Sequence, residues 1–209
     1  MNGPNDKDFA DTRESDDAPD SQLFSTAFAG LGMAGAALVP WEARAVEIDA
    51  RRSSTERGTQ MLQSAWAQDK YMSQLAPASI ANLGRFFDFA YVAGNRDIIR
   101  QDEYGDYMVV VLSGTIAVDR QQPWGERLRL AETRTGDILG EMSLLDSGIR
   151  FSTCTSLTAC DVAILSAQGM DEMMNADPRL AASLVVLLAR KLSLRLRVVS
   201  ARLSEIKPG

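Results

Sequence analysis

The sequence predicts a mainly β domain, built as a sandwich or barrel and flanked by helices. In the middle of the chain, short apolar runs alternate with a period of two and are bounded by Gly, Asp or Ser. Helical spacing stands on both sides of these runs. A parallel α/β sheet would need helices between the strands, and the runs leave no room for them. The chain has 209 residues, 45% of them apolar, which is enough for one sizeable core.

The chain opens on an acidic, polar stretch. Residues 1–22 carry seven acids against two bases, so they account for −5 of the net charge of −6. Such a composition is typical of a disordered tail, and it lacks the basic beginning of a secretory signal. The rest of the chain is close to neutral, so general affinity for nucleic acid, which needs a basic face, is not indicated.

The cysteines and the lack of histidine restrict the chemistry. Because the chain has no histidine, a catalytic Ser-His or Cys-His pair, a His-containing zinc site and a His proton shuttle are excluded. No nucleophile is paired with a base in the sequence, so we do not expect an enzyme. We also expect no metal ion and no cofactor. Cys154 and Cys160 lie in β-like apolar runs and are expected to be buried, reduced thiols of a cytoplasmic protein, with a disulfide as the alternative.

Residues 23–59 are expected to form an apolar arm and a linker. No charge occurs from Ser21 to Trp41, which is long enough to span a bilayer, but Ala, Gly and Ser make the transfer energy marginal. A membrane span is therefore the least favoured reading, beside a helix that packs through small residues and a loosely ordered arm. The linker contains Arg-Arg-Ser-Ser at 51–54, which matches kinase substrate or inhibitor sites and also arises often by chance.

Residues 60–209 are expected to form the folded domain, with helices at 60–84, a β region at 86–166 and C-terminal helices at 168–206. Helical spacing runs from Met61 to Leu75 until Pro77 ends it, and a short helix follows at 79–83. The predicted strands are RFFDFAYV (85–92), RDIIRQ (96–101), YMVVVLS (107–113), TIAVDR (115–120), RLRLAE (127–132), DILG (137–140), FSTCTSLT (151–158) and CDVAILS (160–166).

Two C-terminal helices are expected, one over residues 167–177 and a long one that begins at Pro178, where a missing N–H has no cost. The long helix has two apolar seams, so we expect one to pack on the barrel and the other to form a homodimer, unless the barrel covers both. Its basic face is either solvated or paired with the acidic tail or a partner. The seams are Leu180, Leu184, Leu187, Leu194, Val198 and Ala201, and Val185, Leu188, Leu192 and Val199.

The stretch GDILGEMSLLDSGIR, residues 136–150, predicts an anion site. Its glycines allow a tight exit from a strand, and Glu141 begins a short apolar turn whose N–H groups are ready to bind an anion. Arg150 can close on the same anion with a forked pair of donors. A carboxylate beside an anion needs a neutral donor on the same ligand, and a sugar hydroxyl is suitable. The implied ligand is an anionic sugar phosphate.

These residues carry a resemblance that covers residues 86–203. The matching stretches are Ala93-Gly94, IIRQ from Ile98, YGDYMVVVLSGTIAV at 104–118, GDILGEMSLL at 136–145, and Arg150 followed by FSTC. In these stretches the chain resembles the cyclic nucleotide-binding domain of catabolite activator proteins, regulatory subunits of cyclic AMP-dependent kinase and cyclic nucleotide-gated channels. The resemblance implies a β jelly roll, a double-stranded β-helix, with a long C-terminal helix that closes over the base.

The resemblance also implies roles for individual residues. Glu141 would accept a hydrogen bond from the ribose 2′-hydroxyl, and Arg150 would bind the exocyclic phosphate oxygens. The backbone N–H groups of Met142 and Ser143 would help to hold the phosphate, and Gly140 would provide the room. The implied ligand is cyclic AMP or cyclic GMP, and a cyclic di-GMP receptor is an alternative.

The implied ligand-binding set continues with Phe151, which would contribute a backbone N–H, and Ser152. Phe151 departs from the family pattern, in which a small residue follows the arginine. Its ring would point towards the space of the base, where it can stack on a base or block one. An internal Glu141–Arg150 ion pair in a pocket that has lost its ligand is therefore the alternative.

The expected output runs through a separate protein partner. Catabolite activator relatives carry a helix-turn-helix domain after the long helix, whereas this sequence ends at Gly209, so DNA binding is not expected. The sequence thus predicts a stand-alone regulatory module that signals through its C-terminal helix and N-terminal arm. A ligand-free scaffold with a vestigial pocket is the alternative.

Overall fold

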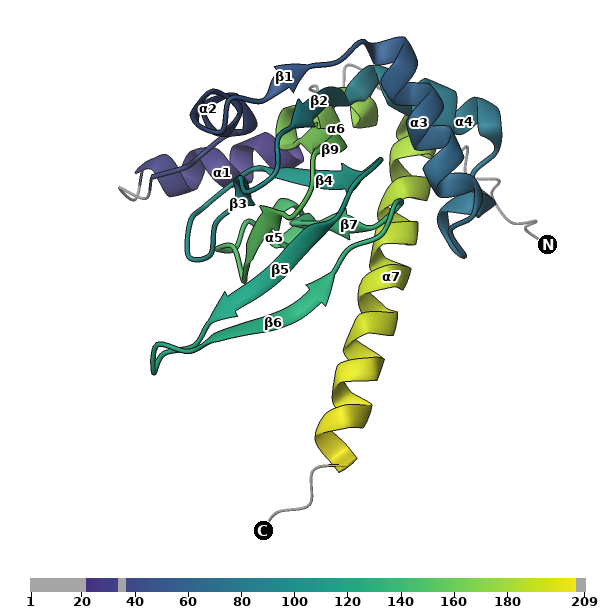
Figure 1. The fold of residues 1–209 in the computed structure, drawn as a ribbon. Helices are drawn as coiled ribbons and strands as arrows, with labels where there is room; N and C mark the ends of the chain where they lie inside the picture. Colours follow the sequence, from purple (N-terminus) through teal and green to yellow (C-terminus); the bar gives the residue numbers. More distant parts are fainter. Residues whose placement is uncertain (1–21, 34–36, 206–209) are drawn as a thin grey trace, which may run out of the picture.

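The computed structural model describes residues 22–33 and 37–205, which form two antiparallel sheets with helices around them (Figure 1). The five-stranded sheet has the order β1-β2-β9-β4-β7 and the four-stranded sheet the order β3-β8-β5-β6. The strands are β1 (Arg51–Arg52), β2 (Asp88–Val92), β3 (Asp97–Ile99), β4 (Tyr107–Val111), β5 (Ile116–Gln121), β6 (Arg127–Glu132), β7 (Ile138–Leu139), β8 (Thr153–Ser156) and β9 (Cys160–Ser166). Apart from Gln22, the predicted acidic tail lies outside the described residues.

The mainly β prediction is confirmed, and each of the predicted strands appears as one of β2 to β9. Strand β1 was not predicted, because two charged residues show no alternation. It pairs with β2, Arg51 opposite Tyr91 and Arg52 opposite Ala90. This pairing ties the expected linker to the edge of the larger sheet.

The helices of the described chain are α1 (Leu23–Met33), α2 (Trp41–Glu47), α3 (Thr55–Ala67), α4 (Pro77–Leu83), α5 (Glu141–Asp146), α6 (Ala167–Ala176) and α7 (Pro178–Glu205), with short 3-10 turns at Met72–Gln74 and Gly84–Phe86. The predicted helix from Met61 to Leu75 is wrong at both ends. Helix α3 begins earlier, where Ser54 caps it, and it ends well before Pro77. The Asp69 carboxylate accepts hydrogen bonds from the N–H groups of Tyr71 and Met72, each at 2.9 Å, and so holds a turn there.

In the uncharged stretch from Ser21 to Trp41, residues 23–33 form α1, and α2 begins at the last residue, Trp41. Helix α1 packs on α6, where the Asp171 carboxylate accepts from the Phe24 N–H at 2.9 Å and from the Ser25 N–H at 2.8 Å. Phe28 is buried in the core. Within residues 22–33 and 37–205, each helix is too short or too polar to cross a bilayer.

Helix α7 is packed along its first half and exposed along its second. Leu180, Leu184 and Leu187 are buried against the core, whereas Leu194 and Val198 of the same predicted seam are 43% and 44% exposed. Figure 1 shows the C-terminal half extending past the body of the domain. Burial therefore changes along the length of the helix and does not distinguish the two predicted seams, so the partner seam stays a prediction.

Two apolar clusters form the core. One lies between the larger sheet and helices α3, α4, α6 and α7, and the other lies between the sheets and includes Trp41 and Tyr107. Cys154 and Cys160 are free thiols in this second cluster, as predicted. Burial raises the pKa of Cys154 to about 12, so this thiol stays protonated and unreactive.

Candidate ligand-binding site

The candidate site is built around the sharp turn between β7 and α5. Gly140 has a φ of 74°, in the left-handed region. A Cβ atom there would lie 2.5 Å from Nη1 of Arg150 and 2.9 Å from Ile99. Glycine is therefore required both by the backbone and by the approach of the arginine. The room at Gly140 is taken up by the Arg150 guanidinium, and the predicted role of Gly140 towards a ligand stays a prediction.

Arg150 is buried beneath this turn, with 2% of its surface exposed. Its Nη1 donates to the Gly140 carbonyl at 2.9 Å and its Nη2 to the Tyr107 carbonyl at 2.6 Å. The guanidinium carbon lies 4.5 Å from the centre of the Tyr107 ring. Burial lowers the pKa of Arg150, and the nearby Tyr107 and Asp106 oppose that shift.

Arg150 has no salt bridge among the described residues, since its side-chain hydrogen bonds go to neutral carbonyl oxygens. Buried charges in proteins are normally paired, because removal from water costs several kcal/mol per ion. The carboxylate that acts on the Arg150 charge is Asp106. Burial raises the pKa of Asp106, whereas Arg150 lowers it. The guanidinium thus retains positive charge and donors that an anion can use.

Glu141 is the second buried charge, with 4% of its surface exposed. Its carboxylate forms an ion pair with Arg195 of α7, and Arg195 also donates to the Ile138 carbonyl at 3.0 Å. Burial raises the pKa of Glu141, whereas Arg195, Lys191 and Arg150 lower it. The predicted ribose acceptor is therefore in direct contact with the C-terminal helix, and the alternative of an internal Glu141–Arg150 ion pair is not what the structure forms.

The other predicted residues lie around these two charges. Ser143 is buried and Met142 is 47% exposed. The N–H groups of Met142 and Ser143 belong to the first turn of α5, where no intrahelical acceptor exists. Ser152 is partly buried.

Phe151 is turned towards solvent, with 52% of its surface exposed. The Arg120 guanidinium of β5 lies 4.0 Å from the centre of its ring, and Arg120 Nη1 donates to the Phe151 carbonyl at 2.5 Å. The ring is thus held by a cation on the four-stranded sheet. This contact joins β5 to the segment that carries Arg150.

Sequence reasoning missed the residues that arrive from distant parts of the chain. Arg195 was recognised only as part of a basic helix face, and Tyr107 only as part of a strand. Trp41, on the apolar arm, stacks edge-on against Tyr107 with ring centres 5.6 Å apart. No local pattern marks these residues, because their role depends on contacts across 43 or more positions of the chain.

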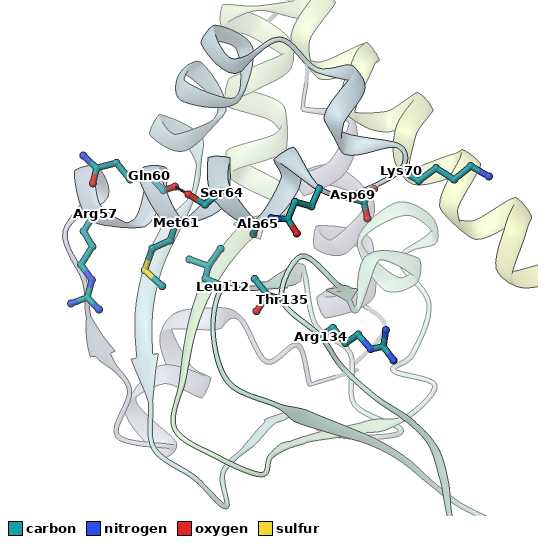
Figure 2. A pocket seen from close by; sticks show the side chains of 11 residues that line it. Arg57, Gln60, Met61, Ser64, Ala65, Asp69, Lys70, Leu112, Arg134 and Thr135 are labelled. Atoms are coloured by element: carbon teal, nitrogen blue, oxygen red, sulfur yellow. Dashed lines mark hydrogen bonds between the residues drawn. The ribbon is translucent and has the colours of Figure 1, made fainter.

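A hollow lies away from the candidate site, between α3 and the turns that precede β5 and β7 (Figure 2). It has a volume of about 790 Å³, and its lining includes Gln60, Ser64 and Thr135 but none of the predicted site residues. Figure 2 shows Arg57 at one side of the hollow and Lys70 and Arg134 at the other, with their charged ends far from one another. They do not converge on a common ligand position.

The described part of the chain contains no group of three or more His, Cys, Asp or Glu side chains that could hold a metal ion. The buried charges at Glu141 and Arg150 are instead suited to an organic anion that also carries a hydroxyl group. This chemistry is consistent with the predicted sugar phosphate.

Residues 91–177 match the family model described as cyclic nucleotide-binding domain. Among curated proteins, the chain is 28% identical over 118 residues to the Cyclic AMP receptor protein of Thermus thermophilus, covering 56% of this chain and 55% of that protein. It is 25% identical over 116 residues to the CRP-like cAMP-activated global transcriptional regulator of Mycobacterium tuberculosis, covering 56% and 52%. The chain thus spans about half the length of these relatives.

Solved structures share the fold. A cyclic nucleotide-binding domain from Methylobacillus flagellatus superposes with a TM-score of 0.69 at 20% identity, covering 77% of this chain and 91% of that chain. The Thermus thermophilus Catabolite Activator Protein gives a TM-score of 0.53 at 28% identity, covering 60% and 61%. The regulatory domain of Toxoplasma gondii PKA, solved with cAMP, gives 0.51 at 21% identity, covering 59% and 47%.

Proposed function

Because the chain carries a domain of the cyclic nucleotide-binding family at residues 91–177, we propose that it is a regulatory module that binds cyclic AMP or cyclic GMP. The ligand phosphate would bind to Arg150 and to the first N–H groups of α5. The ribose 2′-hydroxyl would donate to Glu141. The named relatives are cAMP-dependent regulators and binding domains rather than enzymes, which supports a regulatory role.

The observation that carries this proposal is the buried, unneutralised guanidinium of Arg150. It is 2% exposed and its bonds go to two carbonyl oxygens, so an anion would supply the missing counter-charge. A cyclic phosphate does so with oxygens that match the fork of the guanidinium. Its ribose would reach Glu141, which follows Gly140 on the same turn.

We further propose that Glu141 transmits the presence of ligand to α7. Its carboxylate already holds Arg195, and a hydroxyl that donates to the same oxygens changes the strength and direction of that ion pair. Lys191 on the same helix pairs with Asp69 at 2.5 Å. A ligand shifts α7 only by its difference in affinity for the two helix positions.

A homodimer through the exposed half of α7 is part of this proposal. Side chains that face solvent there are large and apolar, with Leu196 67% exposed and Val199 52% exposed. A second copy of the same helix offers a complementary apolar seam. Sedimentation of the wild-type protein beside Leu196→Glu would test it: a dimer that the substitution dissociates supports the proposal, and a wild-type monomer at all concentrations contradicts it.

The experiment for the ligand is calorimetric titration with cyclic AMP, cyclic GMP and cyclic di-GMP. We expect one of the first two to bind with micromolar or tighter affinity, and Arg150→Ala to weaken binding by about 2 kcal/mol, the scale of a lost charge-assisted contact. Arg52→Ala, which removes a cation from the exposed pair with Asp88, is the matched control. Tightest binding by cyclic di-GMP would change the ligand class, and no heat with any of the three would reject the proposal.

A ligand-free scaffold is the second candidate, and one observation favours it. Both buried charges already have polar partners: Glu141 pairs with Arg195, and Arg150 donates to two carbonyl oxygens. Neither charge therefore depends on a nucleotide for a polar partner. The two candidates differ at Arg195. If the protein is a sensor, the Arg195→Gln variant still binds nucleotide, but α7 no longer responds to it. If the protein is a scaffold with a vestigial pocket, neither the wild type nor the variant binds nucleotide.

A further inference from the structure

The arm segment Leu38–Ile48 is connected to Arg150, the residue expected to bind phosphate, through Glu103, Tyr104 and Tyr107. Its backbone pairs with Tyr104: the Val39 N–H donates to the Tyr104 carbonyl at 2.9 Å, and Leu38 forms a parallel bridge with the same residue. Tyr104 in turn forms an antiparallel bridge with Ile149. The arm, the loop before β4 and the segment that carries Arg150 therefore form one small ladder.

The main chain of Arg150 is held by the middle member of this ladder. Its N–H donates to the Glu103 carbonyl at 2.8 Å, and its own carbonyl accepts from the Asp102 N–H at 2.9 Å. The backbone position of Arg150 thus depends on where residues 102–104 lie. The arm fixes those residues from the opposite side.

A second connection runs through aromatic side chains. Trp41 of α2 is 6% exposed and meets the Tyr107 ring edge-on, at 5.6 Å between centres and 64° between planes. The Arg150 guanidinium lies over the same Tyr107 ring at 4.5 Å. Since the Tyr107 hydroxyl is fixed by a 2.7 Å hydrogen bond to the Ile98 carbonyl, the ring is held between the indole and the guanidinium.

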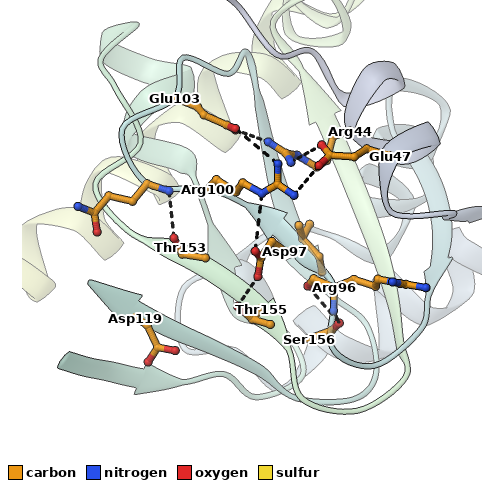
Figure 3. A network of polar contacts seen from close by, with 12 residues as sticks. Arg44, Glu47, Arg96, Asp97, Arg100, Glu103, Asp119, Thr153, Thr155 and Ser156 are labelled. Atoms are coloured by element: carbon orange, nitrogen blue, oxygen red, sulfur yellow. Dashed lines mark hydrogen bonds and ion pairs between the residues drawn. The ribbon is translucent and has the colours of Figure 1, made fainter. Parts of the chain in front are cut away.

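A third connection is ionic (Figure 3). Arg44 of α2 is 1% exposed and pairs with Glu47 at 2.6 Å and with Glu103. Arg100 approaches the same two carboxylates, and Figure 3 shows the two arginines converging on them. Glu103, whose carbonyl receives the Arg150 N–H, is therefore anchored to the arm by its side chain.

We propose that the arm segment Leu38–Ile48 is a positioning element for Arg150, so that arm docking and cyclic nucleotide binding stabilise each other. The inference rests on the proposed function and adds its regulation: whatever displaces the arm weakens the site, and ligand tightens the arm by the same factor. A partner that captures the arm would then release the nucleotide, and the nucleotide would oppose that capture.

The first test compares two buried tryptophans. Trp41→Leu removes the contact with Tyr107, whereas Trp66→Leu removes an indole that is 0% exposed in the other core cluster, against Phe87. Titrated with the cyclic nucleotide that binds the wild type, at a temperature where both variants are folded, Trp41→Leu is expected to raise Kd by about 5-fold or more. Trp66→Leu should change it by less than about 2-fold. Equal effects of the two substitutions would overturn the inference.

The second test uses the unaltered protein and so does not depend on the folding of a variant. Backbone hydrogen exchange is measured with and without the nucleotide. Coupling predicts slower exchange at residues 38–48 as well as at 140–152. Slowing at 140–152 alone would reject the positioning role and leave the proposed function standing, whereas no binding by the wild-type protein would reject both.

Discussion

Two buried arginines, Arg44 and Arg150, lie near Tyr107, and the fold compensates their charges in different ways. Arg44 is 1% exposed and is neutralised by the carboxylates of Glu47 and Glu103. Arg150 is 2% exposed and donates to two carbonyls. Two arginines that are equally buried therefore differ in charge compensation: carboxylates neutralise Arg44, whereas Arg150 has only neutral acceptors. The contrast separates an arginine that maintains the fold from one that is suited to an external anion.

The largest expected effect is the loss of stability on replacing Arg44, the arginine that carboxylates neutralise. Arg44→Met should lower the free energy of unfolding by about 3 kcal/mol, because it removes the buried cation of the cluster and leaves Glu47 and Glu103 to the partly exposed Arg100 alone. Chemical denaturation of the ligand-free protein would measure this change. Arg52→Met, which breaks an exposed pair, should cost less than about 0.5 kcal/mol. Equal losses in the two variants would remove the distinction between buried and exposed pairs.

Arg150→Met should show the opposite profile. In the absence of ligand its unfolding free energy should change by less than that of Arg44→Met, since a buried charge without a counter-ion contributes little net stability. The affinity for the nucleotide should fall by about 2 kcal/mol. Denaturation and titration of the same preparations would give, for each arginine, its effect on the free energy of unfolding and its effect on nucleotide affinity. An Arg150 variant that unfolds as readily as the Arg44 variant but binds ligand normally would contradict the comparison.

A glycine pair isolates the approach of Arg150 from backbone strain. Gly140 and Gly125 both have positive φ, 74° and 96°, so alanine costs each of them about 1–2 kcal/mol. At Gly125 the added Cβ meets nothing within 4 Å, whereas at Gly140 it meets the Arg150 guanidinium. Gly140→Ala should therefore also weaken nucleotide binding, and Gly125→Ala should not. Parallel titrations decide this, and equal affinities would mean that Arg150 adjusts freely.

The smallest expected effect concerns Asp106, which lies between α2 and Arg150. Its Oδ1 accepts no hydrogen bond from the described residues, and burial raises its pKa above 3.8, with Glu42 raising it and Arg150 lowering it. A raised carboxyl pKa contributes stability at low pH, and this contribution is lost as pH rises through the folded value. Asp106→Asn should therefore raise Tm at pH 7 and give no advantage below the ordinary carboxyl range. A gain that persists unchanged at low pH would exclude the ionisation as its cause.

The strands and the turn around Gly140 could be predicted because their signals are local. Alternation identifies β4 and β9, and the sequence from Gly136 to Arg150 places a carboxylate and a guanidinium in one segment. The arm could not be predicted in the same way. Trp41 and Arg44 matter through their contacts with Tyr107 and Glu103, which lie about 60 positions away in the sequence. In addition, α2 is short and its Val46 is exposed, so it shows no marked apolar face. Arg195 was equally hidden among the other bases of α7.

Helix α7 has, in its exposed half, the dimensions of a lever arm. Its packed half ends near Leu188, and the remaining residues to Glu205 extend about 25 Å at the usual helical rise. A rotation of about 10° at the packed end would carry the far tip through about 4 Å, because a helix of this length moves as a rod. Under the proposed function, a change of a fraction of an ångström in the Glu141–Arg195 ion pair would become a displacement that a neighbouring molecule can detect.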